Sequence, residues 1–169
     1  DQEILVEELN EENIKGTDYL LFAAGGSISK KFAPRAVANG SIVIDNSSEF
    51  RMDKDVPLIV PEINPEALKN HKGIIANPNC STIITLTAVN ALNRIAPIRT
   101  MTASTYQAVS GAGAGGPLEL MEEVEALREG KPCQPRVFSH QIAYNLIPQI
   151  GGEAFDGYTS EEMKMQNEG

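Results

Sequence analysis

Continuous apolar runs alternate with helical patterns over the first half of the chain. Residues 19–24 read YLLFAA and end at a glycine pair, which is typical of a strand buried on both faces of a parallel sheet. Residues 27–39 have a helical pattern that Gly40 ends, and residues 41–46 form a second apolar run. Strand, helix and strand in this order predict a parallel pair joined by a right-handed crossover.

The same pattern continues to residue 96 and predicts a larger sheet. Residues 58–60 and 73–76 are short apolar runs, separated by a helical turn that starts at Pro65. Residues 81–96 carry apolar side chains at three- and four-residue intervals, and Pro97 ends this helix. We therefore expect an α/β fold that begins with a partial Rossmann-type parallel sheet.

The second half has a different pattern, and we expect a domain change near residue 78. Residues 98–109 are rich in threonine and alternate in side-chain type, which predicts a strand in a second, mixed sheet. Residues 117–128 have the pattern of a strongly acidic amphipathic helix. Residues 1–78 are thus expected to be one domain and residues 79–169 the start of an α+β domain.

Composition and charge exclude several classes of protein. The chain has 14 lysines and arginines against 23 aspartates and glutamates, a net charge of -9, so duplex nucleic acid would be repelled on average. It contains no apolar run of about 18 residues, so we expect no membrane span. The two cysteines and two histidines show no metal-ligand or disulfide spacing, and we expect no metal and a reducing, cytoplasmic setting.

The stretch Asn77-Pro-Asn-Cys-Ser-Thr82 is the strongest candidate for chemistry. It places Cys80 after a strand and at the start of an apolar helix. Unpaired N–H groups and the positive end of the helix dipole stabilise a thiolate there, which makes the sulfur nucleophilic. The alternative is an ordinary buried thiol.

A glycine-rich stretch, residues 110–116, matches G-x-G-x-x-G. A dinucleotide fingerprint should be followed about 20 residues later by a parallel strand ending in an acid, and the sequence here reads KPCQPRV. We therefore reject it as the principal Rossmann loop. What remains is a turn whose N–H groups could approach a phosphate or nicotinamide, or a simple chain reversal.

The remaining candidates are weaker when each is taken alone. Arg51 follows a predicted strand at the sheet edge where ligands bind, and it could hold an oxyanion, but the residue type favours a solvated surface position. His71 and His140 lie in polar loops and are expected at the surface. Cys133 lies between two prolines, with no helix start to activate it.

Several long stretches together resemble the aspartate-semialdehyde dehydrogenase family, in the branch from Gram-positive and many other bacteria. They are LFAAGGSISKKFAPRAVANG, IVIDNSSEFRMDKDVPLIVPEIN, GIIANPNCSTI, STYQAVSGAGAGG, KPC, NLIPQI and YTSEEMKM. The resemblance covers residues 17–166. It implies NADPH-dependent reduction of L-aspartyl-4-phosphate to L-aspartate 4-semialdehyde and phosphate, a step toward lysine (through diaminopimelate), methionine, threonine and isoleucine.

The resemblance also implies roles for particular residues. Cys80 takes the position of the nucleophile that forms a thioacyl enzyme, and Gln107 that of the residue orienting substrate and thioester. Arg51 and Asn79 match positions that hold the phosphate. The positions along NADP are Ala24, Gly25, Gly26, Ser27, Ser110, Gly111, Ala112, Gly113 and Ala114.

On this resemblance residues 1–78 are a partial NADP-binding domain, and residues 79–169 are part of a catalytic and dimerisation domain of a homodimer. The family's opening G-x-x-G-x-x-G turn and its distal general-base histidine are missing, so we expect an internal fragment that is inactive alone. We assign the proton-transfer role to neither histidine of this chain.

Three alternatives remain open at this stage. N-acetyl-glutamyl-phosphate reductase and acyl-CoA reductases would share a cysteine nucleophile, and substrate choice depends partly on residues beyond Gly169. A non-catalytic homologue that keeps the fold is the third. Retention of Cys80, Gln107 and Arg51 together argues against this last alternative.

Overall fold

The computed structural model describes residues 3–169, which divide into two compact units. The first unit runs to Met101 and also includes Lys164–Gly169, and the second is Thr102–Met163. Each unit is described by itself below.

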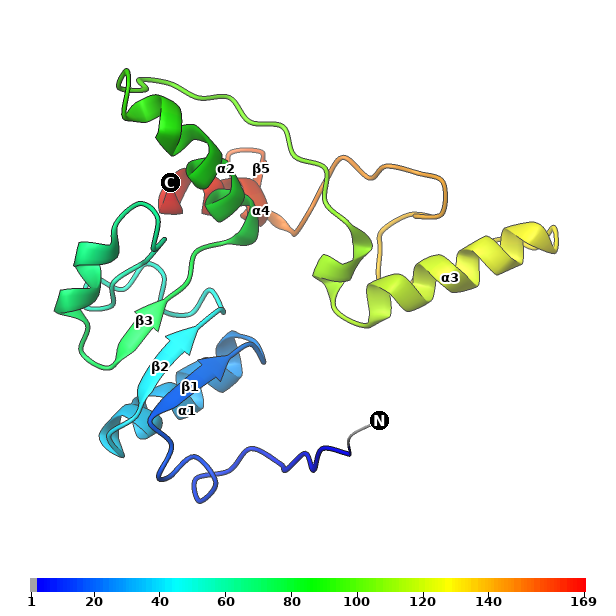
Figure 1. Ribbon diagram of the computed structural model, residues 1–169. Helices are drawn as coiled ribbons and strands as arrows, with labels where there is room; N and C mark the ends of the chain where they lie inside the picture. Colours follow the sequence, from blue (N-terminus) through cyan, green and yellow to red (C-terminus); the bar gives the residue numbers. More distant parts are fainter. Residues whose placement is uncertain (1–2) are drawn as a thin grey trace. The chain divides into compact units, whose positions relative to one another are not determined.

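A parallel sheet organises the first unit. Its strands are β1 (Tyr19–Phe22), β2 (Ile42–Asp45) and β3 (Ile74–Ala76), in that spatial order (Figure 1). All pairs are parallel, with Leu21 opposite Ile44 and Ile44 opposite Ile75. Helix α1 (Gly26–Ala38) connects β1 to β2. The three predicted strands, the first helix and the α/β fold class are therefore confirmed.

The core of this unit lies between α1 and the sheet. Helix α1 buries Ser29, Phe32, Ala33 and Ala36, which recur at the spacing of one helix face. The three apolar ones form one cluster with Ile14 before β1, Phe22 of β1 and Val43 of β2. Burial of this face positions the strand ends that carry the candidate site.

Residues 58–60 were expected to form a further strand, and this prediction is wrong. The structure has only one parallel bridge there, between Leu58 and Ala76. Two prolines explain why the ladder stops. The Ile59 N–H donates to the Ala76 carbonyl and the Ala76 N–H donates to the Pro57 carbonyl, both at 3.0 Å. A longer ladder would need a backbone N–H from Pro57 or Pro78, and proline has none.

Two helical segments complete the first unit. The 3-10 helix η1 (Pro65–Asn70) begins at a proline, as expected, and α2 (Cys80–Asn93) follows β3. The Ile98 N–H donates to the Asn93 side chain at 2.9 Å after the last turn of α2. The predicted apolar stripe is exposed: Ile84 and Leu92 of α2 are 70% and 62% exposed, and Ile95, just after the helix, is 86% exposed.

The second unit is built around one long helix. Its elements are η2 (Val109–Ala112), α3 (Gly115–Arg128), β4 (Glu153–Phe155) and β5 (Tyr158–Thr159), with the first residues of α4 (Ser160–Glu168). Strands β4 and β5 pair in an antiparallel hairpin. The helix expected at 117–128 is confirmed.

The strand expected at 98–109 is wrong. Residues 98–108 have no regular secondary structure, and nearly all of them are exposed. Alternating side chains favour extended backbone, but a strand also needs a neighbour to accept and donate its backbone hydrogen bonds. Within the described residues, no such neighbour pairs with this segment.

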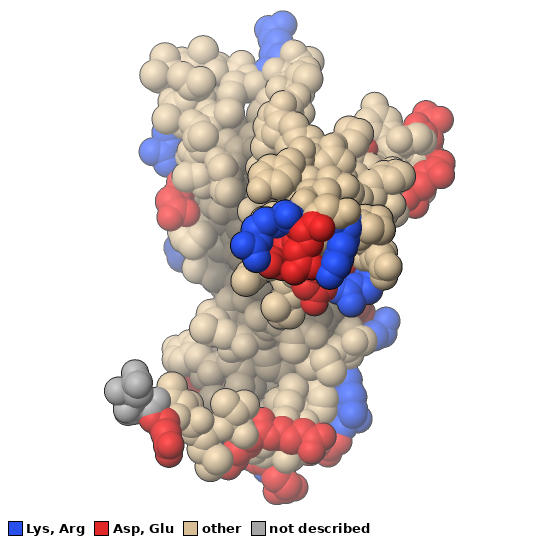
Figure 2. Space-filling model, turned by 90° about the vertical axis from the view of Figure 1, so that its right-hand side faces the viewer, with Lys and Arg blue, Asp and Glu red and all other residues tan. Residues whose placement is uncertain are grey.

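Helix α3 turns two acids inward and carries ion pairs outside. Glu119 and Glu123 are 2% and 3% exposed, whereas Leu118 and Met121 are 58% and 68% exposed. The end of α3 faces the viewer in Figure 2, where acidic and basic side chains lie side by side. The exposed pairs near this end are Arg128 with Glu125 and Lys131 with Glu129. Among the described residues, no helix is long and apolar enough to cross a membrane.

Candidate active site

The carboxyl ends of the three parallel strands meet at one edge of the sheet, and two asparagines join them. The Asn46 N–H and side-chain amide both donate to the Phe22 carbonyl, at 2.9 and 3.0 Å. The Asn77 N–H donates to the Asp45 carbonyl at 2.8 Å, and its side chain donates to Asn46 Oδ1 at 2.9 Å. These bonds extend the order of the sheet into the loops that follow each strand.

Asp45, the last residue of β2, fixes the loop that leads to Arg51. Its side chain is fully buried. It accepts the Ser29 hydroxyl of α1 at 2.5 Å and the Ser47 hydroxyl at 2.7 Å. A buried carboxylate with these partners ties α1 to the segment after β2. Sequence reasoning did not single out Asp45, although an acid ending an apolar strand was a visible signal.

Arg51 is buried, so the surface position that its residue type favoured is wrong. Only 9% of the residue is exposed. Its Nε donates to the Asn77 carbonyl at 2.9 Å and one terminal nitrogen donates to the Asn46 carbonyl at 2.9 Å. Two backbone carbonyls, one after β2 and one after β3, therefore hold the guanidinium plane at this sheet edge.

Glu168, the last residue of α4, completes this cluster. Its carboxylate pairs with Arg51 Nη1 at 3.1 Å and accepts the Asn79 N–H at 2.5 Å. The Glu168 side chain is 3% exposed and the Arg51 side chain 7%. Because 117 positions separate these residues, no local sequence signal could have revealed the contact.

Cys80 is the first residue of α2, and its thiol is exposed. Asn79 caps the helix: its side-chain oxygen accepts the N–H groups of Ser81 and Thr82 at 3.0 and 3.3 Å. The helix start expected for this cysteine is confirmed, and a buried thiol is excluded. Arg51 and Asn79, the two predicted phosphate-binding residues, come together through Asn77 and Glu168.

The turn at residues 24–27 lies at the same edge, after β1. Gly25 has φ +93° and precedes the first residue of α1, and no atom lies within 4 Å of where its Cβ would be. Ala24 and Ser27 are exposed. Backbone N–H groups at a helix start, with open space beside them, fit a phosphate group of a dinucleotide.

Gln107 and residues 110–114 lie in the second unit. Gln107 is exposed in an irregular segment. Two of the three motif glycines have roles within the unit, since Gly113 has φ +75° and a Cβ at Gly116 would lie 2.0 Å from the Val109 carbonyl oxygen. Chain reversal and helix packing explain these two, whereas Gly111 has open space around it.

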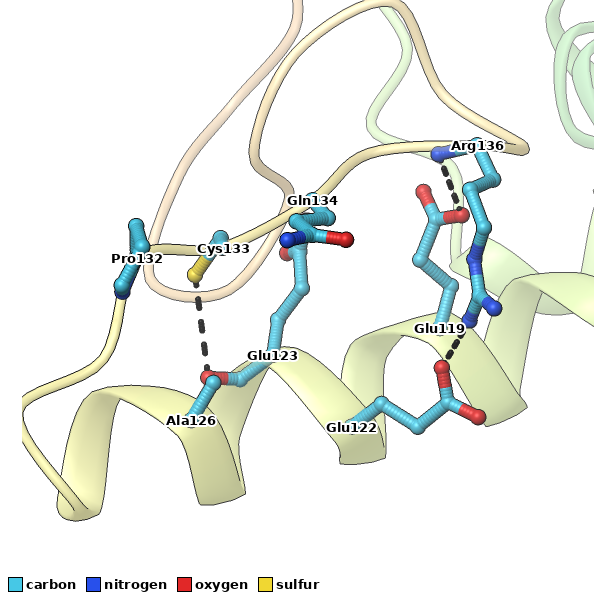
Figure 3. A pocket seen from close by; sticks show the side chains of 8 residues that line it. All are labelled: Glu119, Glu122, Glu123, Ala126, Pro132, Cys133, Gln134 and Arg136. Atoms are coloured by element: carbon cyan, nitrogen blue, oxygen red, sulfur yellow. Dashed lines mark hydrogen bonds and ion pairs between the residues drawn. The ribbon is translucent and has the colours of Figure 1, made fainter.

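A small pocket beside α3 contains Cys133 (Figure 3). The thiol is half-buried and donates to the Glu123 carbonyl at 3.7 Å. Burial, followed by the Glu123 charge, raises the pKa of Cys133. This environment disfavours a thiolate, in agreement with the inactive role expected for this cysteine.

Glu119 lines the same pocket and binds the loop that closes it. Its carboxylate accepts the backbone N–H groups of Arg136, Val137 and Phe138 at 2.8, 2.6 and 3.0 Å. Burial alone would raise the pKa of Glu119, but these three donors and the Arg136 charge outweigh it and hold the pKa below the usual range.

The histidines have no place in this site. His71 is half-buried, and its Nδ1 accepts the Gly73 N–H at 3.1 Å, which is a local turn contact. His140 is exposed, as expected. Across residues 3–169, no group of three His, Cys, Asp or Glu side chains is arranged to hold a metal ion.

Two family models match the chain in succession. The semialdehyde dehydrogenase NAD-binding domain matches residues 1–71, and the semialdehyde dehydrogenase dimerisation domain matches residues 89–169. The parallel sheet of the first unit agrees with the NAD-binding domain of this class. The chain belongs to the semialdehyde dehydrogenase family.

Within this class, the relatives are aspartate-semialdehyde dehydrogenases, and the resemblance expected from the sequence is confirmed. The enzyme from Aquifex aeolicus is 52% identical over 97% of this chain, and that from Bacillus subtilis is 46% identical over 99%. The chain spans about half the length of the curated relatives it matches, 49% and 50% for these two.

Solved structures agree with the sequence matches. Aspartate semialdehyde dehydrogenase II from Vibrio cholerae is 49% identical, with a TM-score of 0.85 over 88% of this chain and 45% of that one. A further structure of the Vibrio cholerae enzyme, complexed with ASA, matches equally well. The Francisella tularensis enzyme, at 27% identity, has a TM-score of 0.78 over 94% of this chain and 51% of that one.

Proposed function

We propose that this chain carries the nucleophile and the phosphate-binding groups of an NADP-dependent aspartate-semialdehyde dehydrogenase. The observation that supports this most is the cluster at the sheet edge. The exposed Cys80 directly follows Asn79 in the sequence. The Asn79 N–H and the buried Arg51 side chain together bind an anionic group, the Glu168 carboxylate. Arginine and a helix-start N–H are typical partners of phosphate oxygens.

In the proposed first step the Cys80 thiolate attacks the acyl carbon of L-aspartyl-4-phosphate. The new C–S bond forms as the C–O bond to phosphate breaks, and phosphate leaves with both electrons of that bond. Arg51 and the Asn79 N–H stabilise the charge that develops on it. The product of this step is a thioester on Cys80.

In the second step the thioester is reduced and C–S cleavage returns the thiolate, with L-aspartate 4-semialdehyde as product. A nicotinamide dinucleotide, when bound, would supply the hydride for this step. The turn at residues 24–27 would bind the dinucleotide, since it offers helix-start N–H groups beside open space. Residues 110–114 are proposed as the nicotinamide-side loop, with Gly111 giving open access, and Gln107 as the group that orients the thioester.

The wider setting follows from the family. We infer a homodimer formed through the second domain, with residues 1–78 and 79–169 as the parts of the two domains. We also infer a cytoplasmic enzyme whose product feeds lysine, methionine, threonine and isoleucine synthesis. The name of the matched dimerisation domain supports the homodimer.

The test is the phosphate-dependent reduction of NADP by the intact protein with L-aspartate 4-semialdehyde. We expect Cys80→Ser to lower kcat at least about a thousandfold, because the nucleophile is lost. Cys133→Ser is the matched control and should stay within about twofold of wild type, since this thiol lies beside α3. Turnover that survives Cys80→Ser would overturn the proposal.

A further inference from the structure

The Glu168 carboxylate contacts both hydrogen-bond donors that we propose to bind phosphate, Arg51 and the Asn79 N–H. One oxygen faces Arg51 Nη1 at 3.1 Å, and the other accepts the Asn79 N–H at 2.5 Å. Both oxygens are therefore engaged, and 3% of the side chain is exposed. A phosphate with two oxygens on the same donors would occupy the same space.

The rest of the Arg51 guanidinium is held by the backbone. Nε donates to the Asn77 carbonyl, and a terminal nitrogen donates to the Asn46 carbonyl. Both carbonyls belong to the loops pinned to the sheet by Asn46 and Asn77. Arg51 can therefore keep its position while the partner at Nη1 changes.

Helix α4 is suited to give up this contact. Apart from the Glu168 side chain, its residues are half-buried or exposed, so little apolar packing opposes a movement of this segment. The described partners that hold the Glu168 carboxylate are Arg51 and the Asn79 N–H.

We propose that Glu168 is an internal competitor of phosphate: its carboxylate closes the Arg51–Asn79 anion site in the free protein and must leave before phosphate binds. The proposal rests on the proposed function. Two anions cannot share these donors, because like charges at such a distance repel strongly. The apparent affinity for phosphate is thus the intrinsic affinity multiplied by the fraction of molecules in which Glu168 has left the site.

Calorimetric titration of the intact protein with inorganic phosphate, without nucleotide, tests this competition. If Glu168 closes the site about nine-tenths of the time, Glu168→Gln should bind phosphate about tenfold more tightly than wild type. Glu66→Gln is the control, because Glu66 is an exposed acid in η1 of the same unit and its loss changes the net charge equally. It should bind within about twofold of wild type.

Hydrogen exchange on the wild-type protein gives a second readout that needs no substitution. Phosphate should increase exchange of the backbone N–H groups at the end of α4, residues 164–168, as Glu168 leaves. Unchanged or slowed exchange there, or a Glu168→Gln affinity at or below the wild-type value, would overturn the competition.

Arg51→Leu separates failure of the competition from failure of the proposed function. If Arg51→Leu abolishes phosphate binding while Glu168→Gln has no effect, the phosphate site stands and the competition is wrong. If phosphate binds equally well with Leu at position 51, the proposed phosphate site itself is wrong, and the competition fails with it.

Discussion

Arg51 is buried together with its hydrogen-bond partners. Only 9% of the residue is exposed, so its charge needs partners inside the protein. The guanidinium donates to two backbone carbonyls and pairs with one carboxylate. From the residue type alone, a surface position was the better expectation, because arginines are mostly exposed. The partners that reverse this expectation lie in three separate segments, and only folding brings them together.

The two cysteines should differ sharply in reactivity. In the intact protein we expect iodoacetamide at neutral pH to alkylate Cys80 faster than Cys133, because Cys80 is exposed and burial beside α3 raises the pKa of Cys133. Peptide mapping by mass spectrometry after timed quenching measures both rates. Equal rates for the two thiols would contradict the environments described for them.

At the scale of elements, α3 shows how a helix can hold a loop through its acids. Glu119 accepts three backbone N–H groups of residues 136–138, and Glu123 accepts those of Ile142 and Ala143 at 2.8 Å each. A loop without regular structure has no ladder partners of its own, so its buried N–H groups need such acceptors. An acidic helix pattern predicted the helix, but not that two of its acids face inward.

The Glu119 contacts should be lost in acid. Because the pKa of Glu119 in the folded protein is below the ordinary value of about 4.3, its contribution to stability is complete above that pH. It falls as the pH drops through the lower folded value. Amide resonances of residues 136–138 followed by NMR between pH 6 and 2 should therefore titrate below about 4.3. A midpoint at or above 4.3 would be inconsistent with these hydrogen bonds.

Gly73 allows β3 to start against α1, and a side chain there should destabilise the first unit. Its φ is +106°, and an added Cβ would lie 2.4 Å from a methyl carbon of Val37. Strain and crowding together predict a loss of about 2–4 kcal/mol in the free energy of unfolding for Gly73→Ala, measured with urea. Gly152→Ala, where nothing lies within 4 Å, is the control and should change it by less than about 1 kcal/mol. Equal effects would contradict the close approach of Val37.

At the scale of the whole molecule, large apolar side chains remain exposed in both units. They include Ile84 and Leu92 of α2 and Ile95 after it in the first unit, and Leu118, Met121 and Tyr144 in the second. Large exposed apolar side chains are typical of surfaces that other protein segments cover. It agrees with a chain that spans about half the length of its curated relatives and matches a dimerisation domain.

The 169-residue chain by itself should therefore lack dehydrogenase turnover. His71 is engaged in a local turn through the hydrogen bond that it accepts from the Gly73 N–H, and the chain spans about half the length of its curated relatives. We expect no phosphate-dependent NADP reduction above background when the purified chain is mixed with L-aspartate 4-semialdehyde. Measurable turnover that depends on Cys80 would contradict this expectation.

Local patterns predicted most of the first unit. The apolar runs of β1, β2 and β3, the helical faces of α1 and the start of α2 at Cys80 are all short-range features, decided by burial and by backbone geometry. The strand expected at 98–109 failed because alternation cannot show whether a partner strand exists. The strand expected at 58–60 is limited to one bridge because Pro57 and Pro78 lack the N–H groups that a longer ladder needs.

By itself the sequence determined the parallel α/β order, the helix start beneath the candidate nucleophile and the family. These depend on residues that are neighbours along the chain. The tertiary structure alone decided that Arg51 is buried, that Glu168 pairs with Arg51 and Asn79, and that two acids of α3 point inward. Each of these needs partners from distant segments, and the free energy of burying a charge depends on partners that only the folded chain supplies.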